Sequence, residues 1–307
     1  MRSATASDSI QPVFPPLPID EWEETKNTLH LYLQIVGKVR MALMPKMNHW
    51  WHVPLYVSPC GLTTHLIPYR DGCFEIELDL INHELAVRSS SGAVQGFALE
   101  GQSVAQFLRQ LFEALRKLSI YATIRPFPYD VPFSTIPFAE DERHAAWDAD
   151  YVTRFWRILL GVNGVFEIFR GRYLGKSTSV HLFWHHMDLA LTRFSGHAAP
   201  YDGGTAADRE AYSHEVISFG FWAGDAQVRE PAFYAYAYPE PKGLGSVALH
   251  PDAAYWTTAP GFTMAYLSYE AVRAANSPRE AILEFLDSTW QGAANLAGWD
   301  VPALTMP

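Results

Sequence analysis

The alternation of apolar and polar residues predicts two strand-rich stretches, each bracketed by helices. The first helix is expected over Trp22–Met44, where Leu29, Leu33 and Val36 recur at helical spacing before Pro45. Short alternating segments separated by turn residues follow it and predict strands at Val53–Ser58, Leu62–Pro68, Cys73–Leu80, Glu84–Ser89 and Gly92–Leu99. A helix over Gly101–Leu118, capped by Ser103, and a last strand at Tyr121–Arg125 complete this first stretch.

The second part of the chain repeats this order. A long helix is expected over Asp150–Phe169, and a final helix over Ser277–Leu296, capped by Ser277 with Pro278 at its first position. Between them, apolar and β-branched segments predict strands at Ser179–Trp184, Asp188–Phe194, His214–Trp222, Phe233–Tyr238 and Phe262–Leu267. The fold class is therefore expected to be α+β, with two antiparallel sheets each flanked by helices, and the repeated order is consistent with an internal pseudo-duplication.

Proline and glycine mark the expected boundaries. Residues 1–19 are rich in small polar residues and proline and predict a disordered or extended arm. The proline-rich stretch Pro126–Asp141 predicts a linker, which divides an N-terminal half at 20–135 from a C-terminal half at 136–307, packed tightly together.

Composition narrows the functional classes. Trp, Tyr and Phe number 10, 15 and 18, and charged residues make up only 18%, below the roughly 25% that is usual in soluble proteins. Such a chain buries a large core, lines a cavity or hides a face in a homo-oligomer. The net charge of −10 gives no support for nucleic acid as a partner, and no apolar stretch is long enough to predict a membrane span. Two cysteines and no signal peptide predict a reduced, cytoplasmic setting.

Several strings of residues resemble a known family. These strings are Leu29–Leu31, Gln34–Arg40, Asn48–Tyr56, Tyr212–Glu215 and Phe233–Pro241. Together they resemble a bacterial conserved-domain family catalogued as of unknown function, over nearly the whole chain from about Trp22 to Trp299. The resemblance implies no activity, and no catalytic residue is carried over from it.

Twelve histidines are many for a chain with so few charges, and imidazole suits both metal binding and proton transfer. No zinc signature is present, so a metal site has to be assembled from distant segments. His52, His181 and His214 are the expected ligands of one iron, zinc or copper ion, with His49 or Glu215 moving protons. The alternative is that these histidines are buried beside aromatic residues and bind backbone groups.

A polar stripe runs along the first helix. His30, Gln34 and Lys38 are spaced four residues apart, and Arg40 lies close to them. This stripe could line a pocket and hold a carboxylate or phosphate, or it could be the solvent side of the helix.

Three tyrosines share one face of an expected strand. Tyr234, Tyr236 and Tyr238 alternate with small residues, and Glu240 follows between two prolines. Such a stripe can be a sheet surface under a helix, or an aromatic wall whose hydroxyls bind a ligand. Tyr236 and Glu240 are taken as candidate ligand-binding residues.

The leading hypothesis is a metal-dependent enzyme that acts on a small molecule in an aromatic, His-bearing cleft between the two halves, as a hydrolase or a non-haem oxygenase. Lys38 and Arg40 are expected to hold an anionic group of the substrate. The alternatives are a non-catalytic protein that binds a small ligand and an oligomeric interaction protein.

Overall fold

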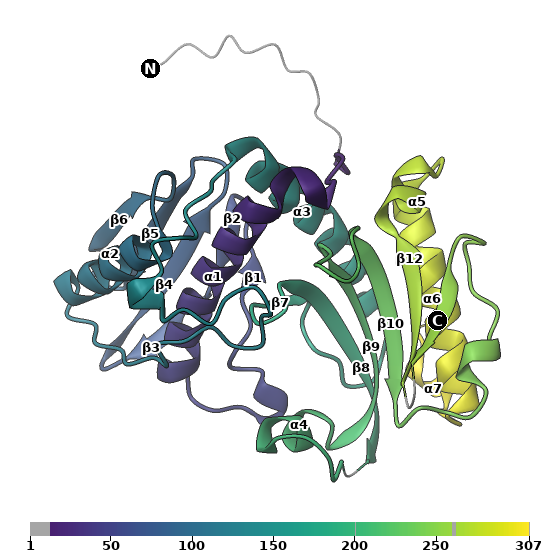
Figure 1. Ribbon diagram of the computed structural model, residues 1–307. Coiled ribbons are helices and arrows are strands. Elements are labelled where there is room, and N and C mark those ends of the chain that lie inside the picture. The colour runs from purple at the N-terminus through teal and green to yellow at the C-terminus, as the bar shows by residue number, and fades with distance from the viewer. Residues whose placement is uncertain (1–12, 200, 260–261, 307) are drawn as a thin grey trace.

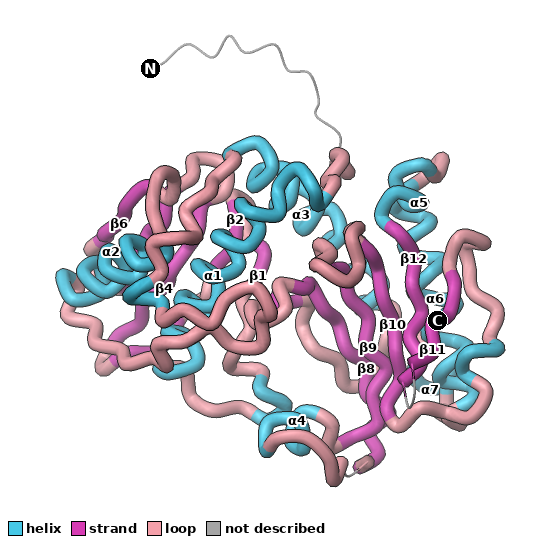
Figure 2. Tube along the Cα trace, viewed as in Figure 1, coloured by secondary structure: helices cyan, strands magenta, loops and turns pink. Residues whose placement is uncertain are grey.

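Two six-stranded antiparallel sheets form the framework of the residues that the computed structural model describes, 13–199, 201–259 and 262–306 (Figures 1 and 2). Helices flank each sheet, so the expected α+β class with two antiparallel sheets is confirmed. The halves also repeat the expected order of a long helix, a set of strands and a shorter helix.

The first sheet buries one face under two helices. Its strands are β1 (Tyr56–Val57), β2 (Gly61–Thr63), β3 (Ile67–Tyr69), β4 (Gly72–Asp79), β5 (Glu84–Ser89) and β6 (Val94–Ala98). They lie in the order β1, β2, β4, β5, β6, and β3 also pairs with β4. On β4, Phe74, Ile76 and Leu78 are buried and alternate with half-buried carboxylates. The helices that cover this face are α1 (Ile19–Leu43) and α2 (Val104–Lys117), and α2 begins at a capping box on Ser103, as predicted.

The second sheet packs against helices on one face only. Its strands are β7 (His181–Phe183), β8 (Asp188–Ala198), β9 (His214–Trp222), β10 (Ala232–Tyr238), β11 (Tyr255–Ala259) and β12 (Phe262–Ser268), in the order β11, β12, β10, β9, β8, β7. Leu191, Phe219 and Phe233 on one face are fully buried against α3 (Ala149–Gly171) and α6 (Pro278–Leu296). The opposite face carries half-buried side chains such as Thr192 and Tyr236, and we call it the open face.

The smaller elements connect this framework. They are the helices α4 (Ala206–Ala211), α5 (Tyr269–Ala274) and α7 (Val301–Leu304), and the 3₁₀ turns η1 (Asn48–Trp50), η2 (Phe138–Glu140) and η3 (Leu244–Ser246). None of the helices in the described part of the chain combines the length and the apolar character that crossing a bilayer requires. Cys60 and Cys73 are both unpaired thiols.

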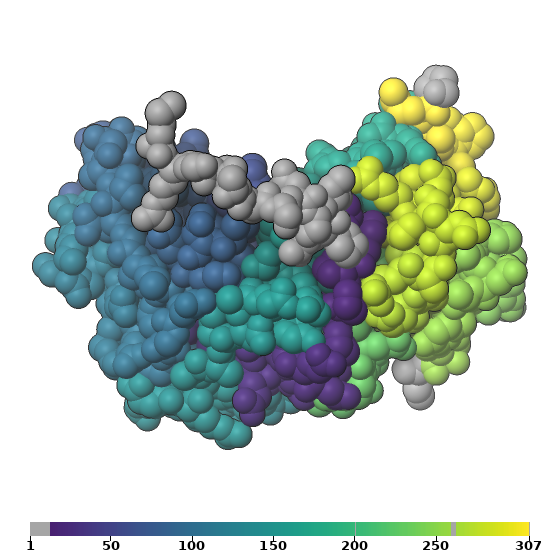
Figure 3. Space-filling view, turned by 90° about the horizontal axis from the view of Figure 1, so that it is seen from above, coloured from purple at the N-terminus to yellow at the C-terminus, as the bar shows by residue number. Residues whose placement is uncertain are grey.

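The two sheets meet edge to edge. Leu55, just before β1, and Leu182 in β7 exchange two backbone hydrogen bonds of 2.9 and 2.8 Å. Helix α1 lies beside this junction, and every residue from Thr28 to Arg40 is buried. In the space-filling view, the purple segment that contains α1 lies between the blue first half and the green and yellow second half (Figure 3). A helix buried on all sides explains why its apolar residues do not form a single stripe.

Trp184 packs directly on the backbone of α1. A Cβ atom added at Gly37 would lie 2.1 Å from Cδ1 of Trp184, so only glycine fits under this ring. The indole Nε1 donates a hydrogen bond of 3.1 Å to the carbonyl of Val53. Trp184 therefore fixes the β7–β8 turn of the second sheet against the helix of the first half.

The described part of the expected N-terminal arm packs against the rest of the molecule. Residues 1–12 lie outside the described residues. Leu17 is fully buried, and the hydroxyl of Tyr269 donates to the carbonyl of Pro15 at 2.8 Å. Residues 15–18 form neither helix nor strand, and the hydrogen bond from Tyr269 of α5 to Pro15 holds them in place.

Some expected elements differ in the structure. The segment Tyr121–Arg125 forms no strand, because the N–H of Tyr121 donates to the hydroxyl of Tyr69 instead of to a neighbouring strand. Strand β11 forms within the stretch Pro239–Pro260, although the glycines and prolines of this stretch are typical of a loop. Here pairing with β12 overrides the local turn signals.

Candidate functional site

The open face of the second sheet is lined by tyrosines that lie over small residues. One row across the strands joins Ala190, Gly220, Tyr234 and Tyr266. A Cβ atom at Gly220 would lie 2.2 Å from Cζ of Tyr234, so the tyrosine ring occupies the space above this glycine. Helix α6 packs on the other face of β10, so the tyrosine stripe is not a surface under that helix.

Asp188 and Tyr234 form a buried polar pair on this face. The hydroxyl of Tyr234 donates to Oδ2 of Asp188, and Oδ1 of Asp188 has no hydrogen-bond partner among the described residues. Burial raises the pKa of the Asp188 carboxyl above its ordinary value. Burial and the nearby carboxylate also raise the pKa of Tyr234 well above its ordinary value. The pair therefore presents one unused carboxyl oxygen in an aromatic setting.

Three segments that are distant in sequence converge at the lower end of the open face. They are η1 with the following tryptophan, the residues that lead into β9, and the end of β10 (Figure 1). The rings of His49 and His214 lie 5.3 Å apart between centroids, edge to face. The hydroxyls of Tyr212 and Tyr236 lie 3.0 Å apart. Three of the strings that mark the family resemblance thus meet at one place.

A lysine and a histidine are in contact there. Nζ of Lys176 lies 2.9 Å from Nε2 of His49, and Nδ1 of His49 lies 3.3 Å from the carbonyl of Ala211. If Nδ1 carries the proton, His49 donates to Ala211 and accepts from the ammonium of Lys176. Burial and the Lys176 charge lower the pKa of His49, which keeps the ring neutral at neutral pH.

The ammonium of Lys176 also faces two aromatic rings. Its Nζ lies 5.1 Å from the ring centroid of Trp51 and 4.8 Å from that of Phe194. No carboxylate forms an ion pair with Lys176 among the described residues, and partial burial lowers the pKa of its ammonium. We call Lys176, His49, His214, Phe194, Tyr212 and Tyr236 the lysine–histidine site.

The backbone at this site is unusual. His49 and Trp50 are consecutive non-glycine residues with positive φ, at 54° and 60°. Such conformations cost free energy and persist only where the surrounding contacts enforce them. The contacts of His49 with Ala211 and Lys176 supply that enforcement, and the turn directs His49 toward the second sheet.

The structure does not bring the three expected metal ligands together. His181 aligns with Gly220 two strands away, and Gly220 is six residues from His214, a separation of about 20 Å along the strand. His52 accepts from the N–H of Met47 and stacks on Trp50. Within the described ranges, no three His, Cys, Asp or Glu side chains are grouped closely enough to hold one metal ion. The expected His52–His181–His214 set is therefore wrong as a shared site, because distant ends of the second sheet carry two of its members.

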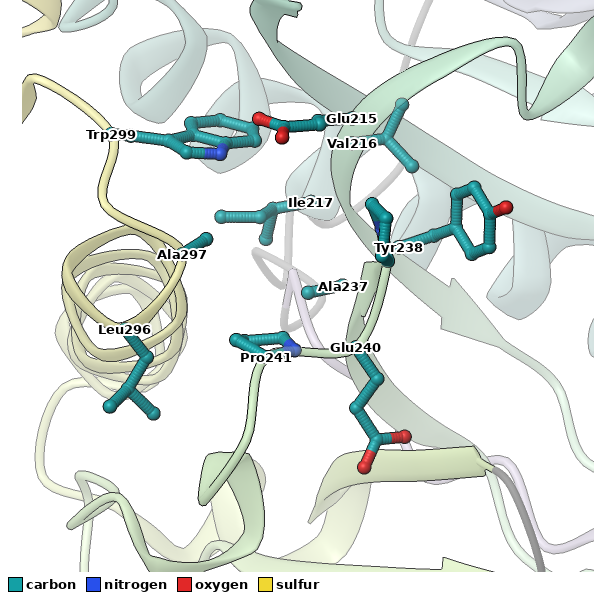
Figure 4. A pocket seen from close by; sticks show the side chains of 11 residues that line it. Glu215, Val216, Ile217, Ala237, Tyr238, Glu240, Pro241, Leu296, Ala297 and Trp299 are labelled. Atoms are coloured by element: carbon teal, nitrogen blue, oxygen red, sulfur yellow. The ribbon is translucent and has the colours of Figure 1, made fainter. Parts of the chain in front are cut away.

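Glu215 and Glu240 line a different cavity, of about 200 Å³, at the end of α6 (Figure 4). Strand alternation places Glu215 on the opposite face of β9 from His214, beside Trp299, so these two residues do not act on one substrate. Oε2 of Glu215 lies 3.5 Å from Nδ1 of His197. Both oxygens of Glu240 accept hydrogen bonds from Thr263, of 2.7 and 2.8 Å, which anchors the start of β12.

The polar stripe of α1 is neither a solvent face nor an anion pocket. Nε2 of His30 lies 3.0 Å from the carbonyls of Trp184 and of His185. The side-chain amide of Gln34 donates to and accepts from the backbone of Tyr129, at 2.8 and 2.7 Å. These side chains fasten the linker and the β7–β8 turn to the helix. Burial lowers the pKa of His30 to about 3.

The two cations of α1 have aromatic rather than acidic neighbours. Nζ of Lys38 lies 5.5 Å from the ring centroid of Trp184, and no described carboxylate pairs with it. Burial and Arg125 lower the pKa of Lys38 to about 8. Arg40 donates to the carbonyl of Thr64 and lies over the ring of Tyr56, 5.4 Å from its centroid. The contacts of Lys38 and Arg40 with rings and carbonyls described here involve no residue of the lysine–histidine site.

The sequence interpretation included His49, His214 and Tyr236 among the candidates but missed Lys176, Tyr212, Phe194 and Asp188. Tyr212 belongs to a string that marks the family resemblance, so it carried a signal. A single lysine before a strand carries none, because only the fold brings Lys176 beside His49.

The sequence matches a family described as of unknown function, DUF5996, over residues 14–306 of the chain. No curated protein and no solved structure matches it.

Proposed function

Because the chain belongs to DUF5996, a family whose description assigns no function, no activity can be carried over, and we propose from its own geometry that the protein binds a small organic anion at the lysine–histidine site. The ligand class that suits this site is an aromatic carboxylate.

One observation carries this proposal: the ammonium of Lys176 lies against two aromatic rings and a neutral imidazole without any described carboxylate as its partner. A cation placed in such surroundings interacts favourably with an anionic ligand, which restores the charge balance. The side chain of Lys176 is exposed, so a ligand can reach it.

The neighbouring side chains define the rest of the ligand. The half-buried rings of Tyr212 and Tyr236 offer faces and edges against which an aromatic ring packs. The hydroxyls of Tyr212 and Tyr236 bond to each other, and a polar substituent on the ligand can take a place in this chain of hydroxyls.

We propose ligand binding and not metal-dependent catalysis. His52, His181 and His214 lie in different parts of the structure, and Glu215 lies across the sheet from His214. Of the two histidines at the site, His49 is a hydrogen-bond partner of Lys176.

Calorimetric titration with benzoate and 4-hydroxybenzoate tests the proposal. We expect saturable binding that weakens at least tenfold in Lys176→Met, because the charge is removed and the chain length is kept. Lys117→Met is the matched control, since Lys117 is an exposed lysine on α2 that pairs with Glu113. Equal affinity in the wild type and in Lys176→Met would refute the proposal, as would a lack of binding to the wild type.

A further inference from the structure

A separate cavity, of about 270 Å³, lies on the helix side of the second sheet. Its walls come from the end of α3, from β8, from α6 and from α7, and they include Arg172, Arg193, Asp287, Trp290, Val301 and Thr305. None of these residues belongs to the lysine–histidine site, which lies on the other face of the sheet.

The central feature of this cavity is a buried arginine. Arg193 follows Leu191 on the helix-facing side of β8, and its side chain is only 2% exposed. Its guanidinium carbon lies 3.5 Å from the ring centroid of Phe169, 4.8 Å from that of Tyr173 and 4.7 Å from that of Trp290. Rings therefore surround the cation.

The hydrogen-bonding capacity of Arg193 is largely unused. One Nη2 hydrogen is donated to the carbonyl of Phe169, and Nε has no partner among the described residues. No carboxylate in the described part of the chain lies within ion-pair distance of Arg193. Burial without such a partner lowers the pKa of Arg193 to about 9.

The cavity carries one uncompensated positive charge. Arg172 already pairs with Asp287, with Nη1 and Oδ2 at 2.8 Å. Arg172, Arg193 and Asp287 together carry a net charge of +1. A monoanionic ligand neutralises this charge, whereas a dianion would leave an excess negative charge. A buried cation that lacks its counter-ion is costly, so an anionic ligand has a large electrostatic benefit to gain here.

We propose that this cavity binds a small monocarboxylate with an apolar chain. A planar carboxylate matches the fork of a guanidinium better than it matches any other side chain. The apolar wall formed by Trp290, Val301 and Pro302 suits the hydrocarbon part of the ligand. This inference does not depend on the function proposed for the lysine–histidine site.

Calorimetric titration of the full chain with hexanoate, with hexanol and with inorganic phosphate tests the assignment. We expect hexanoate to bind saturably, and hexanol and phosphate to bind at least tenfold more weakly. Hexanol has the same apolar chain without the charge, and phosphate has charge without the chain. A lack of hexanoate binding, equal binding of hexanol, or tighter binding of phosphate would overturn the proposal.

Two variants locate the binding. Arg193→Met removes the charge, and Val301→Trp fills the cavity from its wall while both arginines remain, so the second variant decides the matter if the first does not fold. We expect each folded variant to bind hexanoate at least tenfold more weakly. Arg109→Met, an exposed position on α2, is the control. Affinity within twofold of the wild type in a folded Arg193→Met or Val301→Trp protein would place hexanoate elsewhere and refute the site.

Discussion

Nζ of Lys176 lies 2.9 Å from Nε2 of His49, and this contact joins a loop of the second half to a strained turn of the first. The imidazole has to be neutral to accept from the ammonium, and burial keeps it so. The position of the Lys176 ammonium in the proposed binding site thus depends on the backbone conformation at His49.

The strain at His49 predicts how substitutions there differ. His49 has a φ of 54°, a conformation that asparagine tolerates and that β-branched residues resist. We expect His49→Val to lower the free energy of unfolding by about 1–3 kcal/mol more than His49→Asn does. Urea denaturation of both variants at pH 7 measures this difference. Equal stability of the two variants would show that the turn relaxes without cost.

Acid should destabilise the protein through two buried histidines. Burial lowers the pKa of both His30 and His181 to about 3, against about 6.5 in an unfolded chain. Above pH 6.5 neither state binds the proton, so these histidines have no effect on stability. Between pH 6.5 and 3 the unfolded state binds more protons than the folded state. The free energy of unfolding therefore falls by about 1.4 kcal/mol for each histidine with every unit by which the pH is lowered.

Denaturation with urea at several pH values between 7 and 4 tests this effect. His30→Gln and His181→Gln should each have a shallower pH dependence than the wild type, by about one proton. His197→Gln is the control, because His197 is exposed. The same slope in all four proteins would contradict the prediction.

The close approach of Trp184 to α1 predicts opposite effects for two glycines in helices. Gly37→Ala places a Cβ atom 2.1 Å from the indole, so we expect a loss of about 1–3 kcal/mol from overpacking. Gly164 in α3 has open space around it, and Gly164→Ala should gain about 0.5–1 kcal/mol. Thermal and urea denaturation measure both changes. A Gly37→Ala protein as stable as Gly164→Ala would mean that Trp184 moves aside easily.

The buried pair on the open face predicts the effect of removing one hydroxyl. Tyr234→Phe leaves the Asp188 carboxyl without its donor, so we expect the free energy of unfolding to fall by about 1–3 kcal/mol. Tyr255→Phe, at an exposed tyrosine on β11 of the same sheet, should change it by less than about 0.5 kcal/mol. Similar losses in the two variants, measured by urea denaturation, would argue against a specific role of the Asp188–Tyr234 bond.

Removal of the buried charge of Lys38 is expected to stabilise the protein. Burial lowers the pKa of Lys38 to about 8 in the folded protein from its ordinary 10.5, and no carboxylate among the described residues pairs with its ammonium. Below pH 8 both states carry the charge and the folded state bears the cost, so Lys38→Met should be more stable than the wild type by about 1–3 kcal/mol at pH 7. Between pH 8 and 10.5 only the unfolded state keeps the proton, so the stability of the wild type should rise toward that of the variant.

The comparison of Lys38→Met with Lys117→Met, which changes an exposed lysine, separates burial from the general loss of a charge. A Lys38→Met protein that is less stable than the wild type at pH 7 would show that the aromatic neighbours of the ammonium outweigh its desolvation.

The sequence by itself determined the local elements. Ser103 and Ser277 begin α2 and α6 where helix-capping chemistry places them, and strands β5 and β9 have the predicted bounds. These features depend on residues that are neighbours in the chain, so the spacing of apolar and polar residues predicts them directly. The two antiparallel sheets follow from the same signals, because short connections favour antiparallel neighbours.

Only the tertiary structure decided what the polar residues do. His30 and Gln34 have the spacing of a helix face, but α1 is enclosed on every side, and their partners are carbonyl and amide groups of distant loops. The same limitation applies to the candidate site. Lys176 and His49 are separated by 127 residues, and their contact exists because η1 packs against the segment before β9. Local pattern defines which face of an element a side chain occupies, whereas the packing of elements alone defines what that side chain meets.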